Sequence, residues 1–281
     1  MKSLYVVAAL FSPLYLASVP VASAETTTVV VCYPGGPVSQ EDAGPAMDAM
    51  LRVVERVGGW SENTYSSLFT ASADECRSML DSKNPAYAIL SLGLFLEQRA
   101  SHNLTPLVQP RIKGAITERY RIMTRQGAFA GLDDLKGKRV GGSVFDQPQF
   151  MQRIVFNNRM DPVQFFDIKP SHQVLRALRG LDKGELDAVI LNGQQYSALD
   201  SLQLKTPLEV TFTSADIPFM GMTANSKLTT AEDRSRFTRA LEGMCADPEG
   251  RKLCDVFGVE AFTAISPGSI EPMITLWNQG K

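Results

Sequence analysis

The stretch Gly131-Leu-Asp-Asp-Leu-Lys-Gly-Lys-Arg-Val-Gly-Gly-Ser143 predicts a short amphipathic turn followed directly by a strand. Its two leucines are three positions apart, as neighbours on one helical face are, and the Lys-Gly pair after them can end the turn. The extended run that starts at Arg139 ends on Gly142 and Ser143. Ligands of open α/β sheets bind beyond the strand ends, and glycine lets a ligand approach the backbone closely. We therefore expect a ligand-binding loop at this strand end.

Strands and helices alternate on both sides of this stretch, which predicts an α/β protein with parallel strands. Strands are expected at residues 26–32, 65–69, 86–92, 139–142, 164–168 and 188–192, and helices at residues 39–57, 73–80, 147–157 and 171–183. Thr229 and Glu232 predict a capping box at the start of a C-terminal helix. The second set of elements repeats the architecture of the first without repeating its sequence, so we expect two lobes.

The chain is expected to cross between the lobes twice. Residues 118–125 alternate charged and apolar side chains, as an exposed connecting strand does, and residues 208–222 contain two extended runs that lead back. We predict hinge strands at both places. Lobe 1 is then expected to consist of residues 25–119 and 219–281, and lobe 2 of residues 120–218.

The first 24 residues have the pattern of a secretory signal peptide. Lys2 precedes an apolar run from Leu4 to Leu16, and residues 22–24 supply a small-x-small cleavage site. A membrane anchor would need roughly 20 apolar residues without such a site. We therefore expect cleavage after Ala24 and export of the remaining chain.

The charges are nearly balanced, with 28 basic and 30 acidic residues and a net charge of −2. A nucleic-acid-binding protein would show a basic excess or a basic stripe, so we expect no nucleic-acid partner. The two histidines, His102 and His172, are far apart and have no metal-ligand spacing. We expect no metal, no cofactor and no catalytic residue.

All four cysteines lie in the exported part, where disulfides persist. Cys245 and Cys254 flank a predicted helix end and turn, which favours a local bridge between them. Cys32, at the end of the first strand, and Cys76, on a later helix, are then the remaining pair. Four cysteines allow three connectivities, so the pairing rests on proximity alone.

Two segments, Leu132 to Val140 and Leu178 to Val189, resemble the paired signatures of type II periplasmic solute-binding proteins. The resemblance is nearest to the branch that binds phosphate, phosphite or phosphonate, and residues 247–253 are similar to its closing helices. It implies a two-lobed periplasmic-binding-protein-like fold, each lobe a mixed, mostly parallel sheet flanked by helices. It also implies a periplasmic protein, expected to be a monomer, that presents a small-molecule solute to the membrane permease of an ABC transporter.

The loop after the signature strand departs from the pattern of the phosphonate-binding members. Those members usually carry a Ser/Thr-rich loop whose hydroxyls and helix N-terminal amides hold the anion. In this chain only Ser143 supplies a hydroxyl, while Phe145 and Phe150 add apolar area and Asp146 adds a negative charge. The loop therefore favours a neutral, cationic or more apolar solute over a dianionic phosphonate.

The candidate ligand-binding residues follow the ends of four predicted strands, at residues 33–40, 91–95, 142–149 and 192–196. Amides at the helix starts, polar side chains and aromatic rings could converge there on a small ligand. The candidates are Tyr33, Ser39, Ser91, Gly93, Phe95, Gly142, Ser143, Phe145, Gln147, Asn192 and Tyr196. Each of them could instead be an ordinary cap, turn or core residue.

Two alternatives to solute transport stay open at the level of sequence. An enzyme on the same scaffold could use Cys32 as a nucleophile, which would require a free thiol and a base nearby. A sensor or scaffold protein could act on a partner protein instead of a transporter. Neither alternative is supported by a nucleophile elbow, a zinc-protease motif or a phosphate-binding loop in the sequence.

Overall fold

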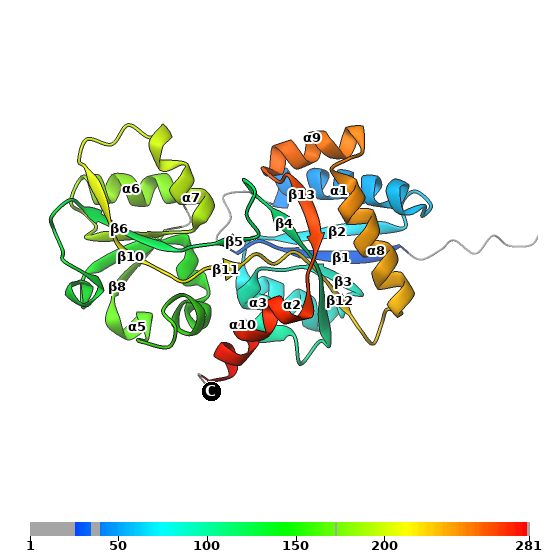
Figure 1. The fold of residues 1–281 in the computed structure, drawn as a ribbon, viewed down its shortest axis with the longest axis horizontal. Coiled ribbons are helices and arrows are strands. Elements are labelled where there is room, and N and C mark those ends of the chain that lie inside the picture. Colours follow the sequence, from blue (N-terminus) through cyan, green and yellow to red (C-terminus); the bar gives the residue numbers. More distant parts are fainter. Residues whose placement is uncertain (1–25, 35–39, 172, 280–281) are drawn as a thin grey trace, which may run out of the picture.

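The computed structural model describes residues 26–34, 40–171 and 173–279. The predicted signal peptide and Ser39 lie outside these residues. Two bodies are joined by extended segments, as Figure 1 shows. Within the described ranges, no helix has both the length and the apolar character needed to cross a membrane.

The first body is built on a six-stranded sheet with the order β13-β4-β12-β3-β1-β2. Parallel pairings join β1 to β2 and to β3, whereas β12 runs antiparallel to β3 and β4, and β13 antiparallel to β4. Four of the six strands therefore point the same way. The strands are β1 (Thr27–Cys32), β2 (Tyr65–Thr70), β3 (Tyr87–Ile89), β4 (Leu104–Arg111), β12 (Met222–Asn225) and β13 (Ala261–Ala264).

Helices cover both faces of this sheet because its strands are apolar on both sides. Val29 and Val31 of β1 pack in one core cluster with Leu51 and Phe237, while Val30 belongs to a second cluster on the opposite face. The helices are α1 (Gln40–Gly58), α8 (Ala231–Met244) and α9 (Pro248–Phe257) on the first face, and α2 (Ala73–Lys83), α3 (Leu92–Gln98) and α10 (Pro267–Gln279) on the second.

The second body contains a five-stranded sheet with the order β10-β6-β9-β7-β8. Its strands are β6 (Arg121–Arg125), β7 (Arg139–Gly142), β8 (Asp167–Pro170), β9 (Ala188–Leu191) and β10 (Leu208–Thr213), of which only β6 runs against the others. The short helices are α4 (Pro148–Phe150), α5 (Pro162–Phe165), α6 (Val174–Asp182) and α7 (Gly193–Ser197), with single turns η1 (Leu132–Leu135), η2 (Ser143–Asp146), η3 (Met151–Val155) and η4 (Leu199–Ser201). The turn and strand predicted for the opening stretch are confirmed as η1 and β7.

The two crossing segments pair with each other between the bodies. Strand β5 (Thr117–Glu118) runs antiparallel to β11 (Ile217–Pro218) in a two-stranded ribbon, which Figure 1 shows between the two larger sheets. Tyr120 and Ser214 exchange backbone and side-chain hydrogen bonds of 2.9 and 3.0 Å, and Arg119 forms a bidentate ion pair with Asp216. The connection between the two bodies is therefore a paired, hydrogen-bonded ribbon.

Three predicted elements differ from the structure in their extent or type. The strand expected at 86–92 stops at Ile89, since Ser91 caps α3 by accepting a hydrogen bond from the Leu94 amide. The helix expected at 147–157 is only a short α4 followed by the π-helical turn η3. The strand expected at 164–168 is displaced to β8, because Asp161 caps α5 just before it.

The capping box of the C-terminal region is shifted by one residue from its predicted place. Thr230 and Asp233 form the reciprocal pair at the start of α8, and the Thr229 hydroxyl donates to the Asn225 carbonyl instead. The prediction of Thr229 with Glu232 was wrong because two adjacent threonines, each followed three residues later by an acid, offer the same signal.

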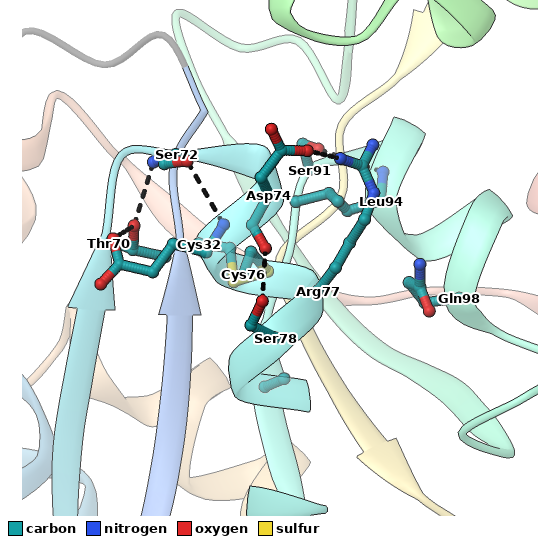
Figure 2. Close-up of a disulfide and its surroundings, with 12 residues drawn as sticks. Cys32, Thr70, Ser72, Asp74, Cys76, Arg77, Ser78, Ser91, Leu94 and Gln98 are labelled. Carbon is teal, nitrogen blue, oxygen red and sulfur yellow. Dashed lines mark hydrogen bonds and ion pairs between the residues drawn. A yellow bond between two sulfur atoms is a disulfide. The ribbon is translucent and has the colours of Figure 1, made fainter. Parts of the chain in front are cut away.

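Both expected disulfides are present. Cys32 is bonded to Cys76, which joins the end of β1 to α2 (Figure 2), and Cys245 is bonded to Cys254, which joins the end of α8 to α9. All four cysteines are thus paired and none is free. The enzyme alternative is incompatible with this pairing, because it requires a free thiol at Cys32.

Candidate functional site

The two bodies touch directly where β3 and β7 end. The Ser91 hydroxyl, at the start of α3, donates a 2.9 Å hydrogen bond to Gln147 Oε1, which follows the signature strand in the second body. Gly93 lies under the same contact. A Cβ on Gly93 would lie 2.4 Å from Gln147 Oε1 and 2.9 Å from Phe150 Cβ, so only glycine fits there. The structure thus brings together three of the predicted site residues, Ser91, Gly93 and Gln147.

Three polar side chains form a network on the second body. Asn192 caps α7 by accepting from the Gln195 amide, and Gln195 Oε1 accepts from the Asn192 amide in return. Gln195 Nε2 then donates to Ser143 Oγ at 3.2 Å, and Ser143 is only 4% exposed. Asn192 and Ser143 are therefore held by structural hydrogen bonds between two neighbouring strand ends.

Gly142 makes the tight turn that ends the signature strand. Its φ of 150° lies in the region that favours glycine, and a Cβ there would stand 2.8 Å from the Ile190 carbonyl oxygen. The close approach of β7 to β9 therefore explains this glycine, and no ligand is needed to account for it.

A carboxylate on the β5–β11 ribbon lies beside these strand ends. Glu118 Oε2 accepts a 2.9 Å hydrogen bond from the Gly193 amide, and Oε1 accepts a longer one of 3.4 Å from the Tyr120 hydroxyl. Burial raises the pKa of Glu118, and these two hydrogen bonds oppose that rise. Tyr33, from the end of β1, is 44% exposed and close enough to Glu118 and Tyr120 for electrostatic interaction. Glu118 on the β5–β11 ribbon thus interacts with residues of both bodies.

A cavity of about 220 Å³ lies beside the Ser91–Gln147 contact, with walls from both bodies. Arg77 on α2 uses all three of its donor nitrogens there: two bind Glu97 at 2.7 and 2.9 Å, and the third binds Asp74 at 2.6 Å. Figure 2 shows Arg77 and Asp74 on α2, next to the disulfide. The lining residues are Asp74, Arg77, Gly93, Glu97, Asp146, Gln147, Pro148, Gln149, Phe150 and Trp277.

The rings of the remaining aromatic candidates are buried in core packing or stacked on a cation. Phe95 is 1% exposed and Phe145 is 8% exposed, and both lie in the shared core cluster, where Phe145 packs edge-on against Phe166. Tyr196 stacks under the guanidinium of Arg121, 4.2 Å from the ring centroid. Phe95 and Phe145 are therefore core residues in this structure.

Several residues of the junction are not among the candidate ligand-binding residues predicted from the sequence. Glu118 and Tyr120 were assigned only to a crossing segment, although their position between two lobes could have marked them. Trp277 lies near the C-terminus, and no pattern within the chain indicates that this segment returns to the other body.

Among the described residues, no group of three or more His, Cys, Asp or Glu side chains could hold a metal ion.

Solved structures with this architecture support the assignment of the fold. XAC2383 from Xanthomonas citri, bound to ATP, is 12% identical over 91% of this chain and 98% of its own, with a TM-score of 0.69. A binding protein component of an ABC phosphonate transporter from Pseudomonas aeruginosa is 16% identical, covers 90% and 86%, and has a TM-score of 0.67. PhnD1 from Prochlorococcus marinus, in complex with methylphosphonate, is 10% identical, covers 90% and 98%, and has a TM-score of 0.64.

At these identities the structural likeness shows a two-lobed type II periplasmic-binding-protein fold and nothing about the ligand. No curated protein matches the chain by sequence. A family profile does match, over residues 59–269, which is well over half of the chain; its description is ABC transporter, phosphonate, periplasmic substrate-binding protein. The chain therefore belongs to the family of periplasmic substrate-binding proteins of phosphonate ABC transporters.

Proposed function

We propose that this protein captures one small neutral or cationic organic solute between its lobes and delivers it to the permease of an ABC transporter. Lobe 1 is taken as residues 25–119 and 219–281, and lobe 2 as residues 120–218. Membership of a periplasmic substrate-binding family supports the transport role and a periplasmic location. The family description alone would suggest a phosphonate, but the residues near the lobe junction favour another class of ligand.

The observation that carries the proposal is the chemistry after β7. A phosphonate dianion needs several hydrogen-bond donors or cations around its oxygens. Here Ser143 is buried and already accepts from Gln195, while Phe145 is turned into the core. Gln147 presents its amide oxygen to Ser91, so its acceptor faces the other lobe. The loop that would hold the anion therefore offers little to a phosphonate.

The charges around the lobe junction also favour a neutral or cationic solute. Two carboxylates, Asp74 and Glu97, line the cavity of about 220 Å³ beside Arg77, which is the single cation among its described lining residues. Each donor nitrogen of Arg77 is already engaged by Asp74 or Glu97. An anion entering this region would meet net negative charge, whereas an organic cation would be attracted to it.

Closure of the lobes around the solute supplies the signal in this proposal. The ribbon of β5 and β11 is the only two-stranded connection among the described sheets, and short paired strands of this kind can bend while the two larger sheets stay rigid. Because Glu118 lies on this ribbon and accepts from Gly193, bending there is coupled to the end of β9.

Thermal unfolding of the mature protein with a panel of probes tests the ligand class. The panel contains methylphosphonate, a protonated organic amine such as putrescine, L-arginine, and the neutral diol that matches putrescine in length. Ligand at 100 times its Kd stabilises the folded state by about 2.7 kcal/mol, which raises the Tm measurably. We expect a rise with an amine or the diol and none with methylphosphonate. A rise with methylphosphonate alone, or no rise with any probe, counts against the proposal.

A further inference from the structure

The C-terminal helix leaves the first body and lies against the second. It follows β13, which pairs with β4, and its residue Ile270 is 1% exposed in the core beside α3. Its last turn reaches η3, the π-helical turn of the second body. In Figure 1, α10 is the red helix that runs from beside α3 towards the green elements. The bodies are thus connected by α10 as well as by the β5–β11 ribbon.

The contacts between α10 and the second body are specific. The Arg153 guanidinium lies over the Trp277 ring, 4.7 Å from its centroid, and Arg153 Nη1 donates to the Trp277 carbonyl at 3.1 Å. Asn158 Nδ2 donates to the Leu276 carbonyl at 3.3 Å. Trp277 is only 4% exposed, although it lies two residues before Gln279, the last described residue. These contacts bury the ring and hold it in place.

The accepting carbonyls belong to the last turn of α10, where a helix has no intrahelical donors for its C=O groups. Helix C-termini also attract positive charge, and the Arg153 guanidinium supplies it. Donors from the second body therefore satisfy the helix end of the first body. If the bodies separated, these carbonyls and the apolar ring of Trp277 would be exposed to water together.

The local backbone of the second body is adapted to this contact. Residues Met151–Val155 form a π-helical turn, a rare geometry that occurs mostly as single turns and often at functional sites. Met151 and Ile154 of this turn are buried in the same core cluster as Ile270 and Trp277. The turn therefore directs Arg153 towards α10 while its neighbours anchor it in the core.

We propose that α10 is an interlobe latch, in which Arg153 and Trp277 are positioning residues that hold the two lobes against each other. The proposal rests on the proposed function in one respect, namely that the lobes open and close. Opening at the β5–β11 hinge must break the contact between Arg153 and Trp277. Trp277 also lines the interlobe cavity together with Phe150, so the latch forms part of the wall that moves.

The chain offers a matched control within one lobe. Arg236 lies over the ring of Trp60, 4.2 Å from its centroid, and donates to the carbonyls of Gly58 and Gly59. Both arginines thus stack on a tryptophan and donate to backbone carbonyls. Of these two pairs, Arg153 with Trp277 joins the two lobes, whereas Arg236 with Trp60 lies within lobe 1. The pairs therefore make the same kinds of contact at different places in the molecule.

Small-angle X-ray scattering of the mature full-length protein without added solute, on the wild type and on Arg153→Gln and Arg236→Gln, tests the latch. Thermal unfolding of each variant is measured alongside. Both variants are expected to lower the Tm. Arg153→Gln alone is expected to increase the radius of gyration and the maximum dimension, and Arg153→Lys, which keeps a cation and a donor, should restore part of the compaction.

Unchanged scattering for Arg153→Gln, with a Tm loss like that of Arg236→Gln, would overturn the latch and leave a merely structural contact. Equal expansion in both variants would also overturn it. If Arg153→Gln does not fold, Trp277→Phe is measured instead, and a radius of gyration equal to that of the wild type then decides against the proposal. Because no solute is added, this result is independent of the probe panel that tests solute binding.

Discussion

At the scale of single residues, Gly93 makes the sharpest prediction about the lobe junction. A methyl group there would meet Gln147 Oε1 at 2.4 Å and Phe150 Cβ at 2.9 Å. The amide can move aside, but Phe150 is 5% exposed in the core and cannot move freely. Gly93→Ala should therefore lower the free energy of unfolding by about 1–3 kcal/mol, as overpacking does.

The control for this change is Gly131→Ala. A Cβ on Gly131 meets nothing within 4 Å, and its φ of −174° is extended backbone that alanine adopts readily. Chemical denaturation of both variants measures the difference. Equal stability of Gly93→Ala and Gly131→Ala would show that the lobes do not pack as described.

Glu118 predicts a pH dependence of opposite sign to that of most acids. Burial raises its pKa above the ordinary 4.5, so the folded protein holds this proton more tightly than the unfolded chain does. Its contribution to stability is then fully present below the unfolded pKa and lost as the pH rises through the folded pKa. The free energy of unfolding of the wild type should fall relative to that of Glu118→Gln as the pH rises from about 4 to about 8.

Asp187 provides the opposite case in the same protein. Its hydrogen bonds from Arg139 hold its pKa below 3.8, so its contribution is present above that value and lost as the pH falls through the folded pKa. The wild type should therefore gain stability relative to Asp187→Asn as the pH rises from strongly acidic values. Urea denaturation at a series of pH values measures the free energy of unfolding of the wild type and of both variants. If the difference between wild type and variant changed with pH in the same direction for both variants, the burial of Glu118 would be contradicted.

Local sequence patterns indicate which residues follow a strand, but not which way their side chains point. Ser91 and Gln147 meet because each follows a strand end and the strand ends of the two lobes lie against each other, while their role in ligand binding stays a prediction. Phe95 and Phe145 also follow strand ends but are buried, because chain position alone does not determine whether a ring faces the solvent or the core. The role of Trp277 depends on a contact with Arg153, 124 residues earlier, which no local pattern reveals.

At the scale of elements, the two disulfides should differ in their effect on stability. The bond between Cys32 and Cys76 spans 44 residues, and the bond between Cys245 and Cys254 spans 9. Loop-closure entropy then assigns about 4 kcal/mol to the first bond and about 2.6 kcal/mol to the second. The double variant Cys32→Ser with Cys76→Ser should lose more stability than Cys245→Ser with Cys254→Ser.

Guanidinium denaturation of the two double variants measures this difference, and thiol titration of the native wild type accompanies it. We expect no reactive thiol in the native protein. A free thiol at Cys32 would contradict the pairing and restore the condition for a nucleophile. A larger loss from the shorter loop would show that packing around that bond outweighs chain entropy.

Strand β4 shows why some elements could not be predicted. It contains Pro106 and Pro110, and proline lacks the amide hydrogen that an interior strand donates. The sheet accommodates Pro106 opposite Thr223, at a shift in register between Met222 and Thr223 of β12. The opening stretch was easier to read, because the turn η1 and the strand β7 are set by local spacing and by the glycines that follow.

At the scale of the whole molecule, the two lobes are in contact through the β5–β11 ribbon, through α10 and through a shared core cluster. One core cluster includes Leu90 and Phe95 from lobe 1 together with Phe150 and Ile154 from lobe 2, so apolar packing continues across the junction. Opening must expose part of this surface, which has a free-energy cost. A solute that binds both lobes would add to that cost, because opening would also break its contacts, and would therefore favour closure further.

Native mass spectrometry of the mature protein, isolated from its own host under non-denaturing conditions, tests whether it captures one non-phosphonate solute. We expect a population heavier by one small organic molecule, which carries no phosphonate group and which raises the Tm of the stripped protein when it is added back. A released phosphonate, or a protein at its bare mass that no extract of the host periplasm stabilises, would rule out capture of such a solute.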